Sequence, residues 1–215
     1  MKGVKFGELH SYRDFNLILS KKEIGAPSVK TNLVDIEGAD GSIDYTDFFG
    51  GPKYGEVKHK FTFTTMIPRS DFSNQYSEVK NVLHGRKLRI VDDDDPGFYY
   101  VGRCYVSSFT SEKGIGQISV ECECEPYKYK LAETVVSRAV DGVQVISLTN
   151  ARKRAVPLVT ITTDTSLNIV FKTYNVWDLG GGSYTLPELE LVEGVNEVTV
   201  TGTGSISFTW QEAML

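Results

Sequence analysis

The sequence predicts a mainly β protein with one helix. Eleven Tyr, eleven Phe and 20 Gly in 215 residues favour strands and tight turns, because aromatic rings pack well on sheets and glycine serves turns. Apolar and polar residues alternate over 57–65 and over 117–125, as in strands with one buried face. The amino-acid composition then changes near residue 130, after which Thr, Val and Gly are frequent. We therefore expect two β domains, residues 1–130 and 131–215.

The net charge and the lack of long apolar runs disfavour several classes of function. The net charge is −5 and the isoelectric point near 5.3, which disfavours a nucleic-acid surface because phosphate binding needs clustered cations. The densest basic cluster is only Arg152–Arg154. The start "MKGVKFGELH" has no apolar signal region, and no 18 apolar residues run together, so we expect neither an export signal nor a membrane span.

One stretch, "SDFSNQYSEVKNVLHG", predicts a helix at about residues 72–84 because its apolar residues recur at helical spacing. Asp71 or Ser73 is the expected cap, and Gly85 suits the left-handed residue that ends a helix. The following "DDDDPG" predicts a hairpin tip with Pro96 and Gly97 at the centre of a type II turn. Calcium binding by these aspartates is the disfavoured alternative, because the spacing of an EF-hand is missing.

The stretch "VECECEPYKYK" predicts the closing strand of the first domain, ended by Pro126. Alternation places Cys122 and Cys124 on its buried face, where free cysteine behaves as a small hydrophobe. The alternative is a zinc site that combines them with Cys104 and one of His10, His59 and His84. Zinc sites more often use C-x-x-C pairs, and three cysteines form no disulfide framework, so core packing is favoured.

Residues 131–215 are rich in Thr, Val and Gly and predict a small β-sandwich of short strands such as "LVTITTD", "LNIVFKTY", "NEVTVTG" and "SISFTW". Four aromatic residues there are either sandwich core or a platform for sugar rings: Tyr174, Trp177, Tyr184 and Trp210. Burial is favoured, with Trp177 beside the glycines 180–182 as the expected exception. Trp177 and Tyr184 are the candidate glycan contacts.

No arrangement of residues predicts catalysis. The chain has three histidines in no known motif, no G-x-S-x-G and no phosphate-binding loop. The "GADGSID" of residues 38–44 is better explained as a tight loop than as acid chemistry. We predict no catalytic, metal or cofactor residue, and a protein that is not an enzyme.

The order of motifs over residues 1–130 resembles the N-terminal domain of siphophage distal tail proteins, the Dit family. The resemblance is carried by "GADGSID", the "LHG" of residues 83–85, "FYYVG" and "PYKY" in that order. The residues that match the family's motifs are Gly38, Asp40, Gly41, Asp44, His84, Gly85, Tyr99, Tyr100, Gly102, Pro126 and Tyr127.

The resemblance implies a split β-barrel with one flanking helix, related to tail-tube proteins, followed by a galectin-like β-sandwich. It implies a hexameric ring in a phage or prophage tail, joining the tail tube to the baseplate or tip that attaches to the host. Tube, tape-measure and tail-tip or receptor-binding proteins would be its partners, DNA would pass through its channel, and no membrane would be involved. The protein would be assembled in the host cytoplasm and located in the virion tail. The alternative is a carbohydrate-binding module for cell-wall glycan. Residues 20–56, which are rich in loops, are the expected clasp on a neighbouring subunit.

Overall fold

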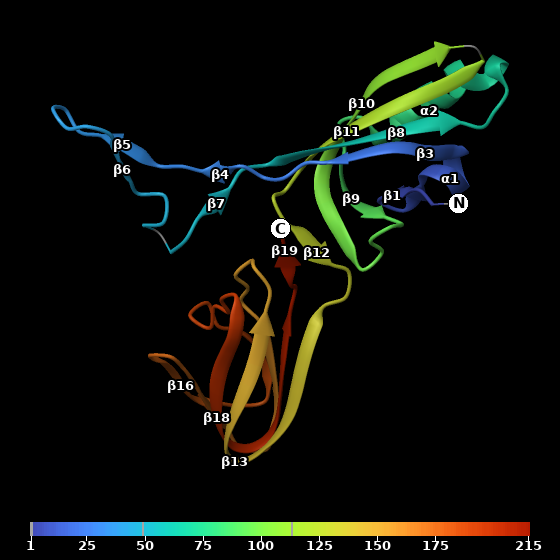
Figure 1. The fold of residues 1–215 in the computed structure, drawn as a ribbon. Coiled ribbons are helices and arrows are strands. Elements are labelled where there is room, and N and C mark those ends of the chain that lie inside the picture. Colours follow the sequence, from blue (N-terminus) through green and yellow to red (C-terminus); the bar gives the residue numbers. More distant parts are fainter. Residues whose placement is uncertain (1, 49, 113) are drawn as a thin grey trace. The chain divides into compact units, whose positions relative to one another are not determined.

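The computed structural model describes residues 2–48, 50–112 and 114–215. The chain divides into two compact units, unit 1 up to Lys128 together with Leu215, and unit 2 from Tyr129 to Met214. The predicted boundary near residue 130 lies beside this division. Strands dominate both units, which confirms the mainly β prediction (Figure 1).

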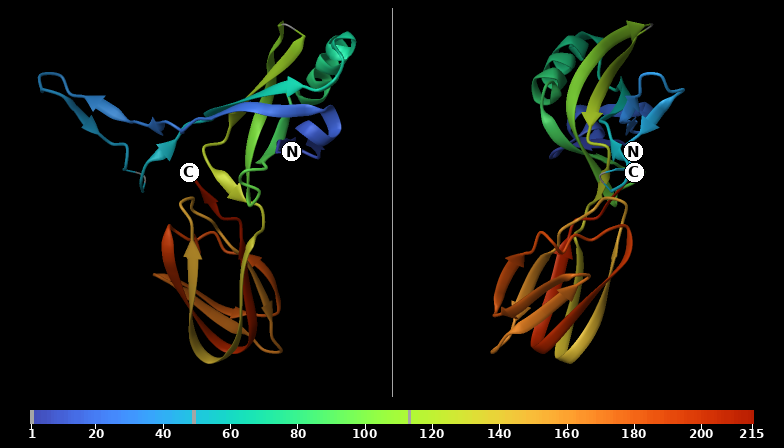
Figure 2. Two further views of the ribbon diagram at one scale, coloured as in Figure 1. Left: turned by 45° about the vertical axis from the view of Figure 1, so that its right-hand side comes forward. Right: turned by 90° about the vertical axis from the view of Figure 1, so that its left-hand side faces the viewer.

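Unit 1 is built on seven antiparallel strands in the spatial order β2-β1-β9-β10-β11-β8-β3. The sheet curls around its core (Figure 2). The strands are β1 (Val4–Phe6), β2 (Leu9–His10), β3 (Leu17–Ile24), β8 (Val57–Thr65), β9 (Lys87–Asp92), β10 (Phe98–Glu112) and β11 (Ile115–Cys124). Four shorter strands between β3 and β8 form a separate arm: β4 (Val29–Lys30), β5 (Leu33–Asp35), β6 (Ser42–Asp44) and β7 (Lys53–Tyr54).

The alternation seen in the sequence decides which faces of β8 and β11 are buried. Every second residue of β8 from Val57 to Thr65 is buried, and the residues between them are not. On β11, Ile118, Val120, Cys122 and Cys124 are all fully buried, as predicted. Phe6 packs edge-on against Phe61 and Phe63 of β8, so one continuous apolar core lies inside the curl.

In the part of the chain that the structure describes, two α-helices accompany the sheet, of which the sequence predicted one. The helix α2 (Phe72–Leu83), preceded by a 3-10 turn at Arg69–Asp71, is the predicted helix, and Gly85 after it has the expected positive φ of 78°. Its capping was predicted wrongly, because no side chain caps its first amides. The short α1 (Ser11–Phe15) was not predicted; a histidine, His10, caps it. Among the described residues, no helix is long and apolar enough to cross a membrane.

The turn between β9 and β10 lies where it was predicted, but its type was predicted wrongly. Phe98 N donates to Asp95 O at 3.1 Å, so Pro96 and Gly97 are the central residues. A type II turn needs a positive φ at its second central residue, and Gly97 does not have one. Proline at the first central position is equally compatible with a type I turn, which needs no positive φ.

Unit 2 is also made of antiparallel strands. They are β12 (Lys128–Lys130), β13 (Thr134–Asn150), β14 (Leu158–Thr162), β15 (Leu167–Phe171), β16 (Tyr174–Leu179), β17 (Gly182–Thr185), β18 (Gly194–Trp210) and β19 (Ala213–Met214). The sheet order is β16-β15-β18-β14-β17, with β13 also paired to β18. Most buried apolar residues of unit 2 form one core cluster, with Val140 as its first member in the sequence and Trp210 as its last. The first and last strands meet, since β12 pairs with β19 and Lys130 N donates to Glu212 O at 3.0 Å.

The longest elements of unit 2 differ from the short strands that were predicted. β13 and β18 have 17 residues each and pair in unbroken register from Thr134–Trp210 to Asn150–Gly194. One half of β18 pairs with β14, and the other half with β15. The strand changes partners at Gly202 and Gly204, which have φ of 135° and 156°. A Cβ at Gly204 would lie 2.6 Å from Thr162 O, so the two strands predicted there are one glycine-bent strand.

Candidate functional site

The most unusual feature of unit 1 is an arm, which we define as residues 25–56. It contains two small two-stranded sheets, β4 paired with β7 and β5 paired with β6. In Figures 1 and 2 it is a narrow ribbon that continues from β3 and β8. No described residue from Lys21 to Glu56 is buried, so the arm has no core of its own. Isolated two-stranded ribbons are at best marginally stable, so strand pairing alone gives the arm little stability.

The outer ribbon of the arm has one apolar and one polar face. Val34 lies directly opposite Ile43 in the β5–β6 register, so their side chains share a face. The opposite face is mainly polar: it carries Asp44 and Asp35, whose carboxylate accepts from Ser42 Oγ at 2.6 Å, but also the exposed Leu33. Val34 and Ile43 are 44% and 43% exposed, although an amphipathic ribbon would normally cover its apolar side.

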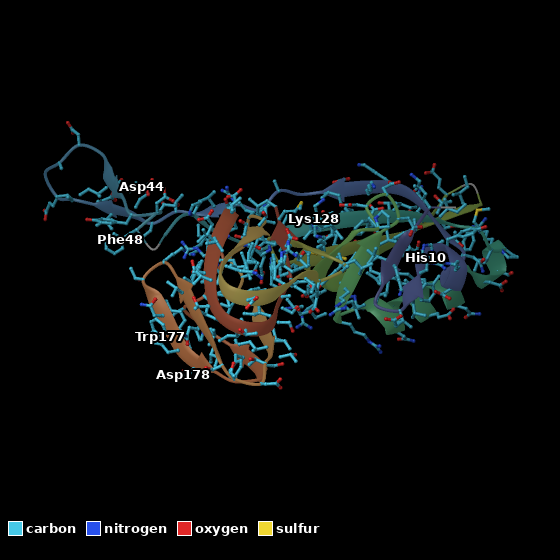
Figure 3. The ribbon with its side chains drawn as sticks, turned by 90° about the horizontal axis from the view of Figure 1, so that it is seen from below. His10, Asp44, Phe48, Lys128, Trp177 and Asp178 are labelled. Atoms are coloured by element: carbon cyan, nitrogen blue, oxygen red, sulfur yellow. The ribbon has the colours of Figure 1, made fainter. Side chains whose placement is uncertain are left out.

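The arm's tip contains residues 38–41 of "GADGSID" as a turn, as the loop interpretation predicted, whereas Ser42–Asp44 form β6. Gly38 and Gly41 have φ of 83° and 77°, and neither would meet another atom with an added Cβ, so they are used for turning and not for close packing. Asp44 accepts from Thr46 N at 2.8 Å, and hydrogen bonds from Thr46 hold the pKa of Asp44 below its usual value. Figure 3 shows Asp44 and Phe48 at the end of unit 1 opposite to His10.

The root of the arm is fixed by a buried histidine. Gly25 N donates to His59 Nδ1 at 3.2 Å, and the His59 ring contacts the Tyr100 ring edge-on at 4.4 Å between centroids. Burial lowers the pKa of His59, so the imidazole is neutral and can accept this bond. A Cβ at Gly25 would lie 2.6 Å from Lys58 O, so glycine is required where the arm leaves the sheet.

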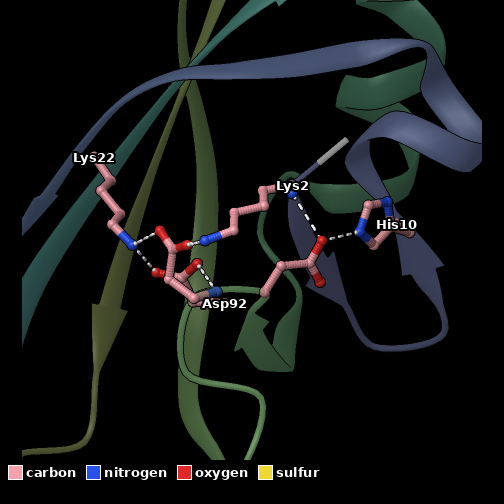
Figure 4. Close-up of polar contacts among 7 residues, drawn as sticks. Lys2, His10, Lys22 and Asp92 are labelled. Atoms are coloured by element: carbon pink, nitrogen blue, oxygen red, sulfur yellow. Dashed lines mark hydrogen bonds and ion pairs between the residues drawn. The ribbon is translucent and has the colours of Figure 1, made fainter.

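The aspartates of the β9–β10 turn are held by cations from distant parts of the sequence (Figure 4). Lys22 bonds to both Asp92 and Asp94, at 2.6 and 2.5 Å, and Lys2 bonds to Asp94 at 2.5 Å. Hydrogen bonds from Lys2 and Lys22 lower the pKa of Asp94 to about 2. These carboxylates therefore fasten the N-terminal strands to the turn.

The adjacent Asp93 belongs to the cap of α1. His10 Nδ1 accepts from Tyr12 N and Arg13 N, so its Nε2–H donates to Asp93 Oδ2 at 2.9 Å. Asp93 also accepts from Gly3 N at 2.8 Å. The histidine thus joins β2, α1 and the acidic turn.

The remaining motif residues lie within unit 1. His84 Nδ1 accepts from Val106 N at 3.1 Å, while Gly85 N donates to Cys104 O at 2.8 Å. At Gly102, an added Cβ would lie 2.5 Å from Cys124 Sγ, so no larger residue fits. Tyr127 contacts Tyr54 edge-on at 5.9 Å between centroids, Tyr99 is buried, and Pro126 follows the end of β11. These contacts support the sheet and the root of the arm.

The three cysteines lie in the core, as favoured from the sequence. Cys104 and Cys122 are directly opposite each other on β10 and β11, with their sulfurs 3.2 Å apart. The hydrogen bond to Cys104 and burial raise the pKa of Cys122, and burial raises the pKa of Cys124 to about 12. Within residues 2–48, 50–112 and 114–215, no group of three or more His, Cys, Asp and Glu side chains is placed to hold a metal ion.

Burial was favoured for three of the four candidate aromatic residues of unit 2, but of these only Trp210 is buried, whereas Tyr174 and Tyr184 are half-buried. Trp210 is buried and Tyr184 packs against the core, with its hydroxyl donating to Gly180 O at 3.0 Å. Trp177 on β16 is 63% exposed, next to Asp178, whose φ is 59° (Figure 3). The structure therefore does not place Tyr184 beside Trp177 as a second open platform, because the Tyr184 ring contributes to the core.

Comparison with known proteins identifies the fold. No protein-family model matches the sequence, and no curated protein matches it. The fold is nevertheless one found in the hubs of phage tails. The crystal structure of SPP1 Dit (gp 19.1), described as a paradigm of the hub adsorption apparatus in phages that infect Gram-positive bacteria, matches with a TM-score of 0.73 and 13% sequence identity. The match covers 100% of both chains, so the resemblance to distal tail proteins is confirmed for the whole fold.

Proposed function

We propose that the protein is a structural, non-enzymatic hub of a long non-contractile phage or prophage tail. It forms a six-membered ring that joins the tail tube to the baseplate or tip. The observation that carries this proposal is the similarity of fold to SPP1 Dit over the full length of both chains. Tape-measure and tail-tip proteins are the expected partners, and the net charge of −5 suits a channel through which DNA passes without binding.

The arm supplies the contact that such a ring needs. Its apolar face, centred on Val34 and Ile43, is exposed on a ribbon without a core. A surface of this kind on one copy and a receiving surface elsewhere on the next copy make a head-to-tail contact, which closes into a ring. We infer that the arm, within the predicted segment 20–56, clasps the neighbouring subunit, with unit 1 as the ring-forming domain.

The experiment is a measurement of mass and symmetry. The purified chain should give a light-scattering mass of six copies and six-fold views in negative-stain images. A monomer at every concentration, without six-fold views, would contradict the proposal; a monomer only at low concentration would not, because rings form by mass action. Neighbouring tape-measure and tail-tip genes would give independent support.

A second function, binding of cell-wall glycan, is favoured by one observation. Trp177 is 63% exposed, and exposed indole rings stack on sugar rings. Substituting Trp177→Ala should abolish retention on cell-wall polysaccharide, whereas Val195→Ala, at a residue of similar exposure (65%), should not. Failure of the intact protein to bind such polysaccharide would remove this candidate.

A further inference from the structure

One long edge of unit 2 is open. β13 pairs with β18 on one side, and among the described residues no strand pairs with its other side. Proteins that remain separate usually protect such an edge with Lys, Pro, a bulge or a short length. From Gly142 to Thr149, β13 has the sequence "GVQVISLT", which contains no charge and no proline, and its register has no bulge.

The other edges of this sheet are protected. β17 has four residues and is followed by Pro187, and β16 has Asp178 at a φ of 59° near its end. The first half of β13 carries the exposed Arg138. The second half of β13 is therefore the unprotected edge.

On the sheet face beside this edge, Glu197 lies opposite Ser147, but the neighbouring row at Val145 carries no charge. The register places Val145, Thr199, Val170 and Asn175 in one row across β13, β18, β15 and β16. Val143 and Val145, at the edge itself, are 68% and 62% exposed. A solvated sheet face looks different, as on β8 and β11 of unit 1, where Lys60 pairs with Glu121 at 3.0 Å.

We propose that two copies of the chain associate through this edge, with the stretch Gly142–Thr149 of one β13 antiparallel to the same stretch of the other, in a register that sets an outward-facing residue, Val143 or Val145, opposite its own copy. Antiparallel pairing of a strand with itself is two-fold symmetric, so each copy supplies the same donors, acceptors and valines. If a strand carries charges, pairing with its own copy brings like charges together, which is unfavourable. The stretch Gly142–Thr149 contains no charged residue, so this penalty does not arise. The nearest acidic residue on the strand, Asp141, would lie toward the uncharged far end of its partner's segment.

This contact is independent of the proposed ring. The clasp of the arm is head-to-tail and stays within one ring, whereas a two-fold contact joins a chain to one outside that ring. A single strand pair is small compared with the roughly 800 Å² per partner of a standard interface, so the association depends on concentration.

The test compares two double variants with the same added charge. V143K/V145K places like charges on both copies at the contact, at positions whose exposure leaves the fold intact. V135K/L158K is the control, since Val135 and Leu158 flank Thr209 in one row of the other half of the sheet and are also exposed. Circular dichroism and thermal unfolding of both should match the unmodified chain.

Sedimentation over a concentration series gives the result. The unmodified chain and V135K/L158K should reach twice the mass that V143K/V145K reaches at the same concentration, whether the smaller species is a ring or a monomer. Equal masses for all three proteins would overturn the pairing. If V143K/V145K had half the mass of the other two proteins but no six-fold species formed, the proposed ring would be contradicted and the pairing would be supported.

Cysteine crosslinking provides a second readout. The three native cysteines are buried, so single cysteines at Asp141, Val143, Val145 and Ser147 would be the reactive ones. Crosslinked dimer should peak at Val143 or Val145 and be absent for Val135→Cys, because antiparallel strands bring only residues near the two-fold axis together. Equal crosslinking yield at every position would contradict the pairing. If the unmodified chain did not self-associate and V143K/V145K abolished its glycan binding, the edge would be a glycan site, which would also contradict the pairing.

Discussion

The double substitution V34T/I43T in the arm is expected to weaken ring formation while leaving the fold unchanged. Threonine keeps the β-branched shape that suits a strand and replaces an apolar group by a hydroxyl. Both residues are exposed in the single chain, so the free energy of unfolding should change by less than about 0.5 kcal/mol. Any loss of assembly would then report on the contact itself.

The magnitude follows from how much apolar surface remains to be covered. Full burial of a Val or Ile side chain contributes about 1.5–3 kcal/mol, and 44% and 43% of these two residues are still exposed. Covering both therefore contributes roughly 2 kcal/mol per contact. Since about 1.4 kcal/mol changes an equilibrium constant tenfold, each contact should weaken roughly 30-fold. A closed ring repeats the contact, so the ring should disappear at concentrations where the unmodified chain assembles.

The assay is mass photometry or light scattering over a dilution series, with L33T as control. Leu33 lies on the same strand but faces the polar side, opposite Asp44, and is 56% exposed. The control should assemble like the unmodified chain. If V34T/I43T assembled equally well, or if L33T were as damaging, the apolar face would not be the contact and the reasoning would be refuted.

Three further predictions concern unit 1. Gly102→Ala should lower the free energy of unfolding by about 1–3 kcal/mol, because its Cβ would press on Cys124 Sγ, whereas Gly97→Ala, which meets nothing within 4 Å, should be nearly neutral in urea unfolding. The pKa of Asp94 is depressed to about 2, so its contribution to stability is present above about pH 4 and is lost as the pH falls toward 2. Lys22→Met should flatten this part of the profile of unfolding free energy against pH. An unchanged profile would contradict the ion-pair network. The three buried cysteines should not react with an aromatic disulfide reagent in the native protein and should all react after denaturation; rapid reaction without denaturant would show that the thiols are accessible.

Elements decided by local pattern could be predicted from the sequence. The strict alternation of residues 57–65 predicted both the strand and its buried face, and helical spacing followed by Gly85 predicted α2. By contrast, α1 has only five residues and is capped by His10, which bonds to an aspartate more than 80 residues away, so no local signal marked it. Gly97 illustrates a similar limit, because the dipeptide Pro-Gly fits more than one turn type.

The long pair of unit 2 and the arm depend on tertiary contacts. Glycines at 142, 202 and 204 interrupt the strand pattern, yet the carbonyl of Thr162 lies so close to Gly204 that the glycine marks a bend and not an end. The arm was expected to be a clasp because it is long and rich in loops, but the sequence could not show that its apolar residues remain uncovered. Whether a valine is buried depends on tertiary contacts, which the local sequence pattern does not reveal.

The pairing of β12 with β19 has an evolutionary consequence. The polypeptide enters unit 2 and leaves it at adjacent points, beside the Lys130–Glu212 hydrogen bond. A module whose ends meet can be lengthened, shortened or exchanged by recombination without changing the spacing of the strands that precede it. Residues 129–214 can therefore change during evolution while the sheet of unit 1, with its arm, is retained.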